Sequence, residues 1–433
     1  MSPRILLALG LLSAMHPARA LQPLDAFLRG ARASSPDDAE ARAARAQSRA
    51  DADAALGTAL PRLSLRGSYT RNEFTSKLQI AGPAGGPPVT VTLTPFDQLD
   101  ASATLDVPLV DLARFARIDA ARKSARASGL QAAATGLQVE SLVAQDFYQL
   151  VANLALVGSS RHALDVAQES LRIAEQRRGA GAAAMLDVDR ARAEVERNVQ
   201  QVAGAELQVS LVARTQQSRT AKAPAREGDV ALADDLHEEP TLESFQPPDA
   251  AIPALGAAIE GRLADEALAR AQRLTLAPSL GASATGRVAS YEGIAGHEAS
   301  WLAVVGLTWS FDLTTLAGIR SSAAAADGAR AREQRARLAA RDDIHRAWET
   351  VRTNIARSRS ARVQADVSAR AAALALQRYQ VGEGSQLDLL QAQRDAFAAD
   401  AGRIQADADL VNSRAQLRVA AGQSLLEAGR GTP

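Results

Sequence analysis

Hydrophobic and polar residues alternate with two different periods along this chain. In residues 111–215 and 313–422, apolar side chains recur at steps of three and four residues, and neither stretch contains a proline. Because a proline inside a helix costs about 3 kcal/mol, stretches this long without one indicate helix. Residues 111–178 alone would extend on the order of 100 Å as one continuous helix, which is longer than any compact domain.

A period of two marks four shorter segments, paired as hairpins at about residues 61–110 and 278–312. In the clearest segment one face is apolar and the other polar: Trp301, Ala303, Val305, Leu307, Trp309 and Phe311 against Thr308, Ser310 and Asp312. Such strands fit the wall of an outer-membrane β-barrel, and they also fit a soluble, half-buried sheet. The first hairpin has the longer connection, with the stretch AGPAGGPPVT, and we expect an exposed surface loop there.

Aromatic residues favour the membrane interpretation of these strands. Eight of the fifteen aromatics fall in or beside them, where an interface girdle would need them. They are Tyr69, Phe74, Phe96, Phe115, Tyr291, Trp301, Trp309 and Phe311. Of these we predict Tyr69, Phe74, Phe96, Tyr291, Trp301, Trp309 and Phe311 to lie at membrane interfaces.

The same order of elements occurs twice. The stretch QRRGAGAAAMLDVDRARAE at 176–194 matches QRYQVGEGSQLDLLQAQRD at 377–395, and Leu186 lies 201 positions before Leu387. We therefore predict two copies of short helix, β-hairpin and long helical hairpin, at residues 21–225 and 251–433. The helical hairpins occupy about 111–215, with its tip near 179–187, and 313–422, with its tip near 380–388. An irregular connector rich in proline and acidic residues spans 226–250.

The repeated stretches have the residues of a helix end followed by a helix start. Glycines let a chain leave a helix with positive φ, and Ser385 or Asp388 can cap or favour the next helix. We expect the glycines to turn the chain and Leu387 and Leu389 to pack against it. Matching lengths in the two repeats indicate that both tips reach the same height.

The first residues predict export, and the number of strands predicts that several copies assemble. Residues 1–20, with Arg4, an apolar run at 5–12 and the small residues Ala18 and Ala20, are typical of a secretory signal peptide. The chain has no cysteine, which excludes a disulfide framework and a lipid-bearing N-terminal cysteine. No later stretch has the roughly 18 apolar residues of a spanning helix. Four strands are too few to close a barrel, so we expect several protomers to share one.

Charge and motifs indicate neither nucleic-acid binding nor catalysis. Lys and Arg together number 49, as do Asp and Glu, so the chain has no general attraction to nucleic acid. The five histidines are scattered without metal-ligand spacing, and neither a nucleophile elbow nor a G-x-G-x-x-G motif after a strand is present. We predict no enzymatic activity, no cofactor and no metal.

The residues resemble the TolC-like outer-membrane efflux proteins over nearly all of the mature chain. The resemblance rests on LPRLSLRGSYTR and LAPSLGASATG entering the hairpins, on LDVPLVDLARFARIDAARKSA and LTWSFDLTTLAGIRSSAAAA leaving them, and on the two glycine-containing turns. It implies a mainly α fold with a membrane β-barrel contribution. In the implied homotrimer, each protomer gives four strands to a shared 12-stranded barrel and long helices to a periplasmic tunnel.

The resemblance also implies a function, a location and partners. It implies the exit duct of a tripartite efflux system that exports small molecules, in the outer membrane of a Gram-negative bacterium, with a periplasmic extension. The implied partners are a periplasmic adaptor protein, an inner-membrane transporter and outer-membrane lipid. An exit duct for type I protein secretion is one alternative, and a periplasmic coiled-coil adaptor or scaffold is a less favoured one.

Functional residues follow from the same resemblance. The tips imply a periplasmic aperture gated by Tyr379, Asp388, Gln391 and Asp187. They also imply adaptor docking at Gly181, Leu186, Gly382, Gly384, Ser385 and Leu387. Gly384 stands where the best-known member has an arginine and Gln391 where it has an aspartate, so that latch cannot be copied here in full. Three Asp388 carboxylates near the axis would favour cations, whereas the simpler interpretation is a solvated aspartate at a helix start.

Overall fold

The computed structural model describes residues 21–80, 86–225, 234–292 and 297–428, so the expected signal peptide lies outside the described residues. The chain divides into two compact units. The first comprises residues 1–41, 132–253 and 338–433, and the second comprises residues 42–131 and 254–337. Both long helices of the repeats contribute residues to each unit.

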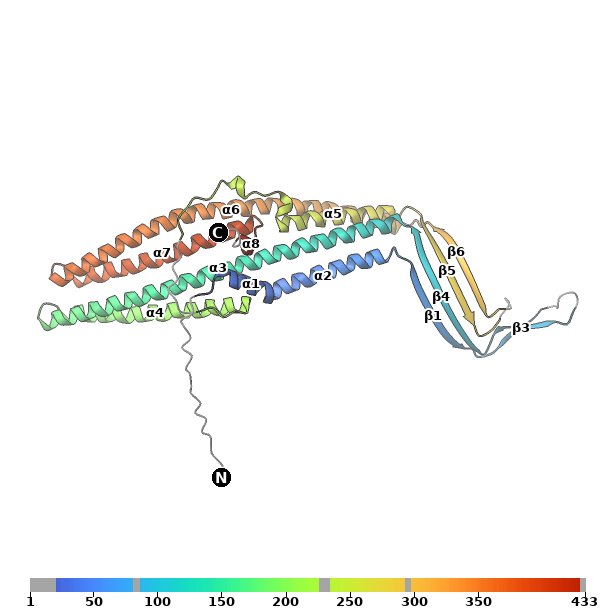
Figure 1. Ribbon diagram of the computed structural model, residues 1–433, viewed down its shortest axis with the longest axis horizontal. Coiled ribbons are helices and arrows are strands. Elements are labelled where there is room, and N and C mark those ends of the chain that lie inside the picture. The colour runs from blue at the N-terminus through green and yellow to red at the C-terminus, as the bar shows by residue number, and fades with distance from the viewer. Residues whose placement is uncertain (1–20, 81–85, 226–233, 293–296, 429–433) are drawn as a thin grey trace, which may run out of the picture. The chain divides into compact units, whose positions relative to one another are not determined.

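Figure 1 labels the elements in chain order. The helices are α1 (Leu24–Ser34), α2 (Pro36–Gly57), α3 (Leu112–Gly179), α4 (Met185–Thr220), α5 (Pro253–Leu274), α6 (Leu313–Val381), α7 (Gln386–Ala420) and α8 (Leu425–Ala428). The strands are β1 (Arg62–Arg71), β2 (Ser76–Ile80), β3 (Val89–Thr94), β4 (Asp97–Val110), β5 (Ser279–Ala289) and β6 (Ala299–Thr308). Short 3-10 helices at Leu242–Phe245 and Asp249–Ala251 are the helical turns of the described part of the connector.

Helices of nearly equal length recur along the chain. Helix α3 has 68 residues and α6 has 69, while α4 has 36 and α7 has 35. Helices α6 and α7 begin 201 residues after α3 and α4, from Leu112 to Leu313 and from Met185 to Gln386. A residue in the first repeat can therefore be compared with the residue 201 positions later. None of the helices in the described part of the chain is long and apolar enough to cross a membrane.

The second unit contains a four-stranded antiparallel sheet in the order β1-β4-β5-β6. Its register pairs Tyr69 with Leu99, Ala103 with Gly286, and Gly286 with Trp301. Strands from both repeats thus join one sheet at the β4–β5 pair. The outer edges of β1 and β6 pair with no strand in the described part of the chain.

The apolar face of this sheet is exposed. Trp301 is 83% exposed, Leu65 77% and Leu307 69%. On the opposite face Arg287 forms an ion pair with Asp100, and the Thr104 and Thr285 hydroxyls lie 3.1 Å apart. The predicted alternation is therefore present, and its exposed apolar side has the character of a surface that contacts lipid or another chain.

Two details of the sheet differ from the sequence-based expectation. Strand β6 ends at Thr308, so Trp309 and Phe311 follow the strand, because Asp312 accepts a 2.6 Å hydrogen bond from the Thr315 amide and starts α6. The first hairpin's connection carries the paired strands β2 and β3 on either side of residues 81–85, which lie outside the described residues. The connection therefore contains a short two-stranded ribbon, and the first half of the stretch AGPAGGPPVT lies outside the described residues.

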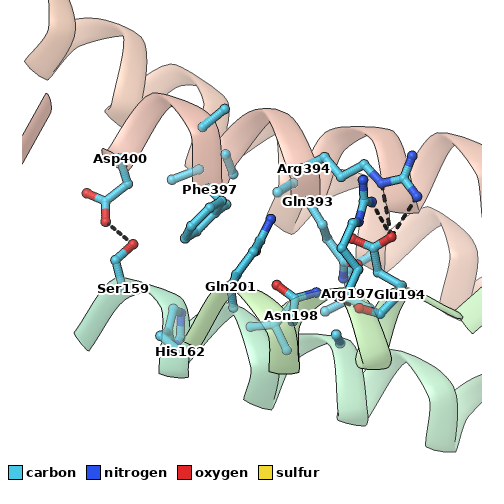
Figure 2. Close-up of a pocket in the computed structure, with 18 of the residues that line it drawn as sticks. Ser159, His162, Glu194, Arg197, Asn198, Gln201, Gln393, Arg394, Phe397 and Asp400 are labelled. Atoms are coloured by element: carbon cyan, nitrogen blue, oxygen red, sulfur yellow. Dashed lines mark hydrogen bonds and ion pairs between the residues drawn. The ribbon is translucent and has the colours of Figure 1, made fainter. Parts of the chain in front are cut away.

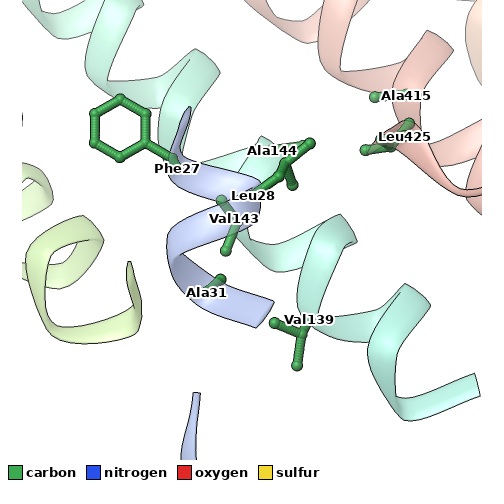
Figure 3. Packing of buried hydrophobic residues seen from close by; sticks show 8 residues of the cluster. All are labelled: Phe27, Leu28, Ala31, Val139, Val143, Ala144, Ala415 and Leu425. Carbon is green, nitrogen blue, oxygen red and sulfur yellow. The ribbon is translucent and has the colours of Figure 1, made fainter. Parts of the chain in front are cut away.

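The core of the first unit forms where α1 packs on α3 (Figure 3). Phe27 and Leu28 of α1 are buried with Val143 of α3, and Leu425 joins them from the C-terminal segment. The remaining members of this cluster are small or branched residues: Ala31, Val139, Ala144 and Ala415. Small side chains allow the long helices to pack closely, in keeping with the scarcity of aromatics in the sequence.

A buried carboxylate ties α1 and the start of α8 to α3. Glu140, 1% exposed, accepts hydrogen bonds from the Arg32 guanidinium (2.9 Å), the Ser424 hydroxyl (2.9 Å) and the Leu425 amide (2.8 Å). Gly136 leaves room for this arrangement, since a Cβ there would lie 2.1 Å from the Arg32 Nη1. A buried carboxylate with three donors is fully satisfied and fixes the neighbouring segments.

The described part of the connector lies against the second helical hairpin. Arg414, buried in α7, forms ion pairs with Asp234 (2.9 Å) and with Glu239. The Trp348 indole donates to the Pro240 carbonyl at 3.0 Å, and Phe245 packs against the cluster around Leu410. The predicted mainly α fold is confirmed, and the described strands form one four-stranded and one two-stranded sheet.

Candidate functional site

Both helical hairpins reverse at a glycine with positive φ. Gly181 has φ 75° and Gly382 has φ 88°, as the sequence predicts. In each turn the amide after this glycine reaches back five residues: Ala182 donates to the Arg177 carbonyl at 2.8 Å and Glu383 to the Arg378 carbonyl at 2.9 Å. This is the hydrogen-bond pattern of a Schellman helix end, which requires a left-handed residue that glycine adopts without strain.

Gly384 has a different role from the one expected. Its φ is not positive, so it does not turn the chain. Its amide donates to the Arg378 carbonyl at 3.1 Å, and a Cβ at this position would lie 3.2 Å from the Arg378 Cβ. Close approach of the backbone to the end of α6 explains glycine here, and this proximity to α6 is not visible in the sequence.

The two tips start their second helices differently. The Ser385 hydroxyl accepts from the Asp388 amide at 3.1 Å, and the Asp388 carboxylate accepts from the Ser385 hydroxyl at 2.7 Å and amide at 3.4 Å. At the first tip the Asp187 carboxylate accepts from the Ala184 amide at 3.3 Å, but the alanine side chain has no oxygen, and the Asp187 amide donates to the Ala184 backbone carbonyl at 3.1 Å. The second tip therefore has a full capping box and the first tip half of one.

Tyr379 is the buried centre of the second tip. It is 3% exposed and packs with Ile173 of α3 and Leu389 of α7. The Arg177 guanidinium carbon lies 4.6 Å from the centre of its ring, and Arg177 also donates a hydrogen bond to the Tyr379 backbone carbonyl. Tyr379 thus connects helix ends from both hairpins of one protomer.

The electrostatic environment of the Tyr379 side chain keeps it neutral. Burial raises the pKa of its hydroxyl, the Asp187 carboxylate raises it further, and the Arg177 guanidinium opposes them. The hydroxyl has no hydrogen-bond partner among the described residues. A buried hydroxyl that is unpaired within one chain is unusual and marks this site as one where further contacts are expected.

The other predicted tip residues are spread over the surface. Leu186 is 56% and Leu387 57% exposed, and Asp388 is also exposed. Leu389 is fully buried, as expected, whereas the expectation that Leu387 packs against the turn is wrong, because its side chain is 57% exposed. Gln391 donates to Asp395 on its own helix at 2.9 Å. The structure therefore brings Tyr379 near Asp187 but places Asp388 and Gln391 in local contacts only.

Below the tips, α7 is bonded to the first hairpin by a series of polar contacts (Figure 2). Arg394 binds the buried Glu194 carboxylate at 2.6 Å, and the Ser159 hydroxyl donates to Asp400 at 2.6 Å. Farther along, Ser141 forms hydrogen bonds with Gln416, and Ala152 packs with Ile404 and Ala408. We call the contacts of Ser159, Ser141 and Ala152 of α3 with α7 the α3–α7 seam. Beside it lies a cavity of about 620 Å³ lined by alanines of α6 and by Phe397.

Sequence reasoning missed Arg177 and the Glu194–Arg394 pair. Arg177 stands in the last turn of α3, where a basic residue is expected for its interaction with the helix dipole alone. Its second partner, Tyr379, lies 202 positions away and becomes visible only when the hairpins pack. In the sequence, the one sign that Arg177 and Tyr379 belong to equivalent helix ends is the alignment of QRR at 176–178 with QRY at 377–379.

One group of side chains in the described residues has metal-ligand geometry. Ligand atoms of Asp234, Asp235 and His237 lie within 4.8 Å of one another. Asp234 is already bound by Arg414, and His237 accepts from the Arg414 Nη1 at 3.0 Å and contacts Asp235. Arg414 therefore already binds two members of this group, Asp234 and His237.

The fold and the tips are those of an outer-membrane channel subunit. Two repeats share one sheet, and each repeat carries a helical hairpin whose tip turns at a glycine. Residues 27–215 and 250–423 match the model of the outer membrane efflux protein family, and the chain belongs to this family. The resemblance stated from the sequence is confirmed, and the family consists of channels rather than enzymes. No curated protein sequence matches the chain.

Solved structures share the fold at low sequence identity. The outer membrane channel CmeC of Campylobacter jejuni is 18% identical, with a TM-score of 0.77 over 98% of this chain and 93% of that one. VceC, an outer membrane protein of Vibrio cholerae, is 16% identical, with a TM-score of 0.77 over 93% of this chain and 96% of its own. The open-state MtrE channel of Neisseria gonorrhoeae is 17% identical, with a TM-score of 0.77 over 94% and 90%.

Proposed function

We propose that this protein is the outer-membrane exit duct of a tripartite efflux system, working as a homotrimer that exports small molecules. The observation that carries the proposal is a difference between equivalent positions of the two repeats. Residues that are covered in the α3–α7 seam have counterparts on α6 and α4 that are exposed. A second copy of the chain would cover those counterparts in the same way.

Three levels of the seam support this equivalence. The contact of Ser159 with Asp400 corresponds to Ser360 and Val199, and that of Ser141 with Gln416 corresponds to Asp342 and Thr215. The third level, Ala152 against Ile404 and Ala408, corresponds to Thr353 against Ala203 and Leu207. All seven counterparts are exposed: Val199, Ala203, Leu207, Thr215, Asp342, Thr353 and Ser360.

Apolar side chains on these two helices strengthen the case. Helix α4 exposes Val199 (44%), Leu207 (56%) and Leu211 (53%), and α6 exposes Val363 (60%), Val367 (50%) and Leu374 (51%). Spacings of four, seven and eight residues place each set on one face of its helix. Because α4 of one copy would meet α6 of the next, the contact joins two different surfaces. Such a contact gives an assembly of limited size only if the copies close into a ring. We take three copies as the family resemblance implies.

The sheet supports placement in an outer membrane. Tyr69, Tyr291 and Trp301 lie toward one end of the sheet, and Trp309 and Phe311 follow β6 at the other end. Trp301 and Trp309 are eight positions apart, a span of roughly 26 Å in a strand. Outer-membrane strands carry an apolar band about 25 Å tall between aromatic residues. Unpaired β1 and β6 edges would join between the three copies.

The tips support a periplasmic aperture and a docking surface. Leu186 and Leu387 expose apolar side chains at both tips, together with Met185 and Val381. We propose that an adaptor protein docks on these residues and on the turns at Gly181, Gly382, Gly384 and Ser385, and links the duct to an inner-membrane transporter. Tyr379, Asp388, Gln391 and Asp187 are the proposed aperture residues.

Transport assays test this function. Purified protein in planar bilayers should form ion-conducting channels, and cells that lack the gene should accumulate a fluorescent efflux substrate that the restored gene removes. A protein without channel activity in bilayers would contradict the proposal. A channel whose loss abolishes secretion of one protein but leaves dye accumulation unchanged would instead identify the protein-secretion alternative.

A further inference from the structure

We propose that the cavity beside the α3–α7 seam is a binding site for an uncharged aromatic molecule that carries N–H or O–H donors. The cavity holds about 620 Å³ and is lined by α3 and α4 of the first hairpin and by α6 and α7 of the second, all within one chain. Pockets that take small molecules have volumes of roughly 300 to 1,000 Å³. The site needs neither a second copy nor an open channel, so its test is independent of the proposed function.

Small side chains on α6 leave the space for the cavity. The α6 residues that line it are Leu376 and four alanines: Ala365, Ala369, Ala372 and Ala373. Their counterparts on α3, 201 positions earlier, are larger than alanine: Leu164, Gln168, Leu171 and Arg172. Packed helices normally leave few voids larger than a water molecule. The second repeat therefore lacks side-chain volume at the positions where the first repeat has it.

The cavity faces away from the surfaces that the proposed ring of copies would cover. On α6, Ala372 is nine positions from Val363, and about 100° per residue places the two on opposite sides of the helix. On α4, Gln201 is two positions from Val199, which again places them on nearly opposite sides. A neighbouring copy that covers Val363 and Val199 would therefore not fill the cavity.

Two buried amide oxygens on the cavity wall have no hydrogen-bond partner among the described residues. They are the Oε1 atoms of Gln201 on α4 and of Gln393 on α7. The Ser170 hydroxyl donates to the Val166 carbonyl at 2.9 Å and accepts from the Gln393 amide nitrogen at 2.8 Å, so the Gln393 oxygen is the free acceptor. Buried acceptors without donors cost free energy, and a ligand with N–H or O–H groups would satisfy them.

The charged side chains of the wall already have partners of opposite charge. Glu194, 5% exposed, is bound by Arg394 at 2.6 Å and also by Arg197. Asp400 forms an ion pair with Arg403 at 2.8 Å. A charged ligand would have to displace one of these partners or remain unpaired in the cavity, and both are costly. The lining therefore favours an uncharged ligand.

The apolar part of the wall favours an aromatic ring. Figure 2 shows Phe397 of α7 and Gln201 of α4 extending toward each other between the two hairpins. The alanines and Leu376 of α6 form the apolar side of the same cavity. A flat ring packed on Phe397 would bury apolar surface against α6 and bring its donors to the Gln201 oxygen.

Binding of N-acetyltryptophanamide to the purified full-length protein tests the site. This probe is uncharged, has an aromatic ring and carries several N–H donors. Equilibrium dialysis should show that it binds about tenfold more tightly than tryptophanamide, its cationic analogue, and N-acetyltryptophan, its anionic analogue. Equal or tighter binding of either charged analogue would overturn the assignment of an uncharged ligand.

Two substitutions locate the probe in the cavity. Gln201→Leu removes an acceptor and should weaken binding about tenfold. Gln208→Leu is the matched control, because it makes the same change at an exposed position of α4 outside the cavity, and it should leave the affinity unchanged. Ala372→Leu introduces the leucine that the first repeat has at this position, and it should fill the cavity and abolish binding.

Thermal melting shows whether Ala372→Leu is folded, and its midpoint should not fall below that of wild type. Wild-type protein that does not bind the probe would overturn the proposal, as would folded Ala372→Leu that binds it as tightly as wild type. Equal affinities of Gln201→Leu and Gln208→Leu would also overturn it, whether or not Ala372→Leu folds.

Discussion

The α3–α7 seam and the outward faces of α6 and α4 have equivalent places in the two repeats but differ in what covers them. Within the chain, Ile404 and Ala408 are 5% and 3% exposed, whereas Leu207, the counterpart of Ala408, is 56% exposed. The larger residue is on the uncovered face. Burial of large apolar side chains is favourable, and in the proposed ring of copies a neighbouring copy would cover this leucine.

The largest effect on stability should come from a substitution that leaves a cavity in the α3–α7 seam. Ile404→Ala removes a buried side chain from the seam and should destabilise the protein by about 2 to 5 kcal/mol, because a cavity remains where the side chain packed. Thermal melting followed by circular dichroism would show this as a lower midpoint. Gln208→Ala, at an exposed position of α4 outside the proposed contact between copies, should change the melting of the helices much less. Equal shifts for the two variants would contradict the packing of Ile404 in the seam.

A charged residue on the exposed face of α4 should separate the copies of the proposed trimer without unfolding them. Leu207→Arg places a guanidinium on the α4 face, where burial against a second copy would be costly. We expect the trimer fraction to fall by about tenfold, a change that corresponds to about 1.4 kcal/mol. Light scattering in detergent measures this directly. Gln208→Arg, at the neighbouring exposed position, is the control and should retain the trimer.

The two tips offer a smaller and more local comparison. Ser385→Ala removes the capping hydroxyl of the second tip and should cost about 1 kcal/mol, while Ala184→Ser should stabilise the first tip by a similar or smaller amount. Hydrogen exchange in the first turns of α7 and α4 should change in opposite directions. A slower exchange in α7 after Ser385→Ala would contradict the capping geometry.

The smallest expected change concerns ion selectivity. Asp388→Asn removes a charge from each copy near the proposed aperture and should reduce cation over anion permeability by about twofold. Reversal potentials in asymmetric salt measure the ratio. Asp187→Asn in the first tip allows the two aspartates to be compared. If the ratio does not change, Asp388 acts only at the start of α7, where its capping bonds place it.

Much of the fold could be predicted because it depends on local sequence. The absence of proline and the three- and four-residue period predicted helices over 111–178, and α3 spans Leu112–Gly179. Glycine at 181 and 382 predicted positive φ at both. Strand alternation is also local, except that β6 ends at Thr308, before Trp309, and Asp312 caps α6, which begins at Leu313.

The site was less predictable because its contacts join distant residues. Arg177 and Tyr379 are 202 positions apart, and the sequence shows neither that α3 and α6 end side by side nor that the guanidinium crosses between them. Gly384 was assigned to the turn because glycines often adopt positive φ, whereas here it allows close backbone approach. Leu387 and Leu389 differ by two positions in a helix, and only the packing decides which of them is buried.

Disulfide cross-linking between paired cysteines tests the central claim most directly, and the chain has no native cysteine to interfere. The pair Val199→Cys with Ser360→Cys should join neighbouring protomers and give covalent trimers on a denaturing gel. The equivalent pair Ser159→Cys with Asp400→Cys, whose wild-type side chains lie 2.6 Å apart, should cross-link within one chain and give monomers. Monomers from the first pair under conditions that oxidise the second would contradict the account.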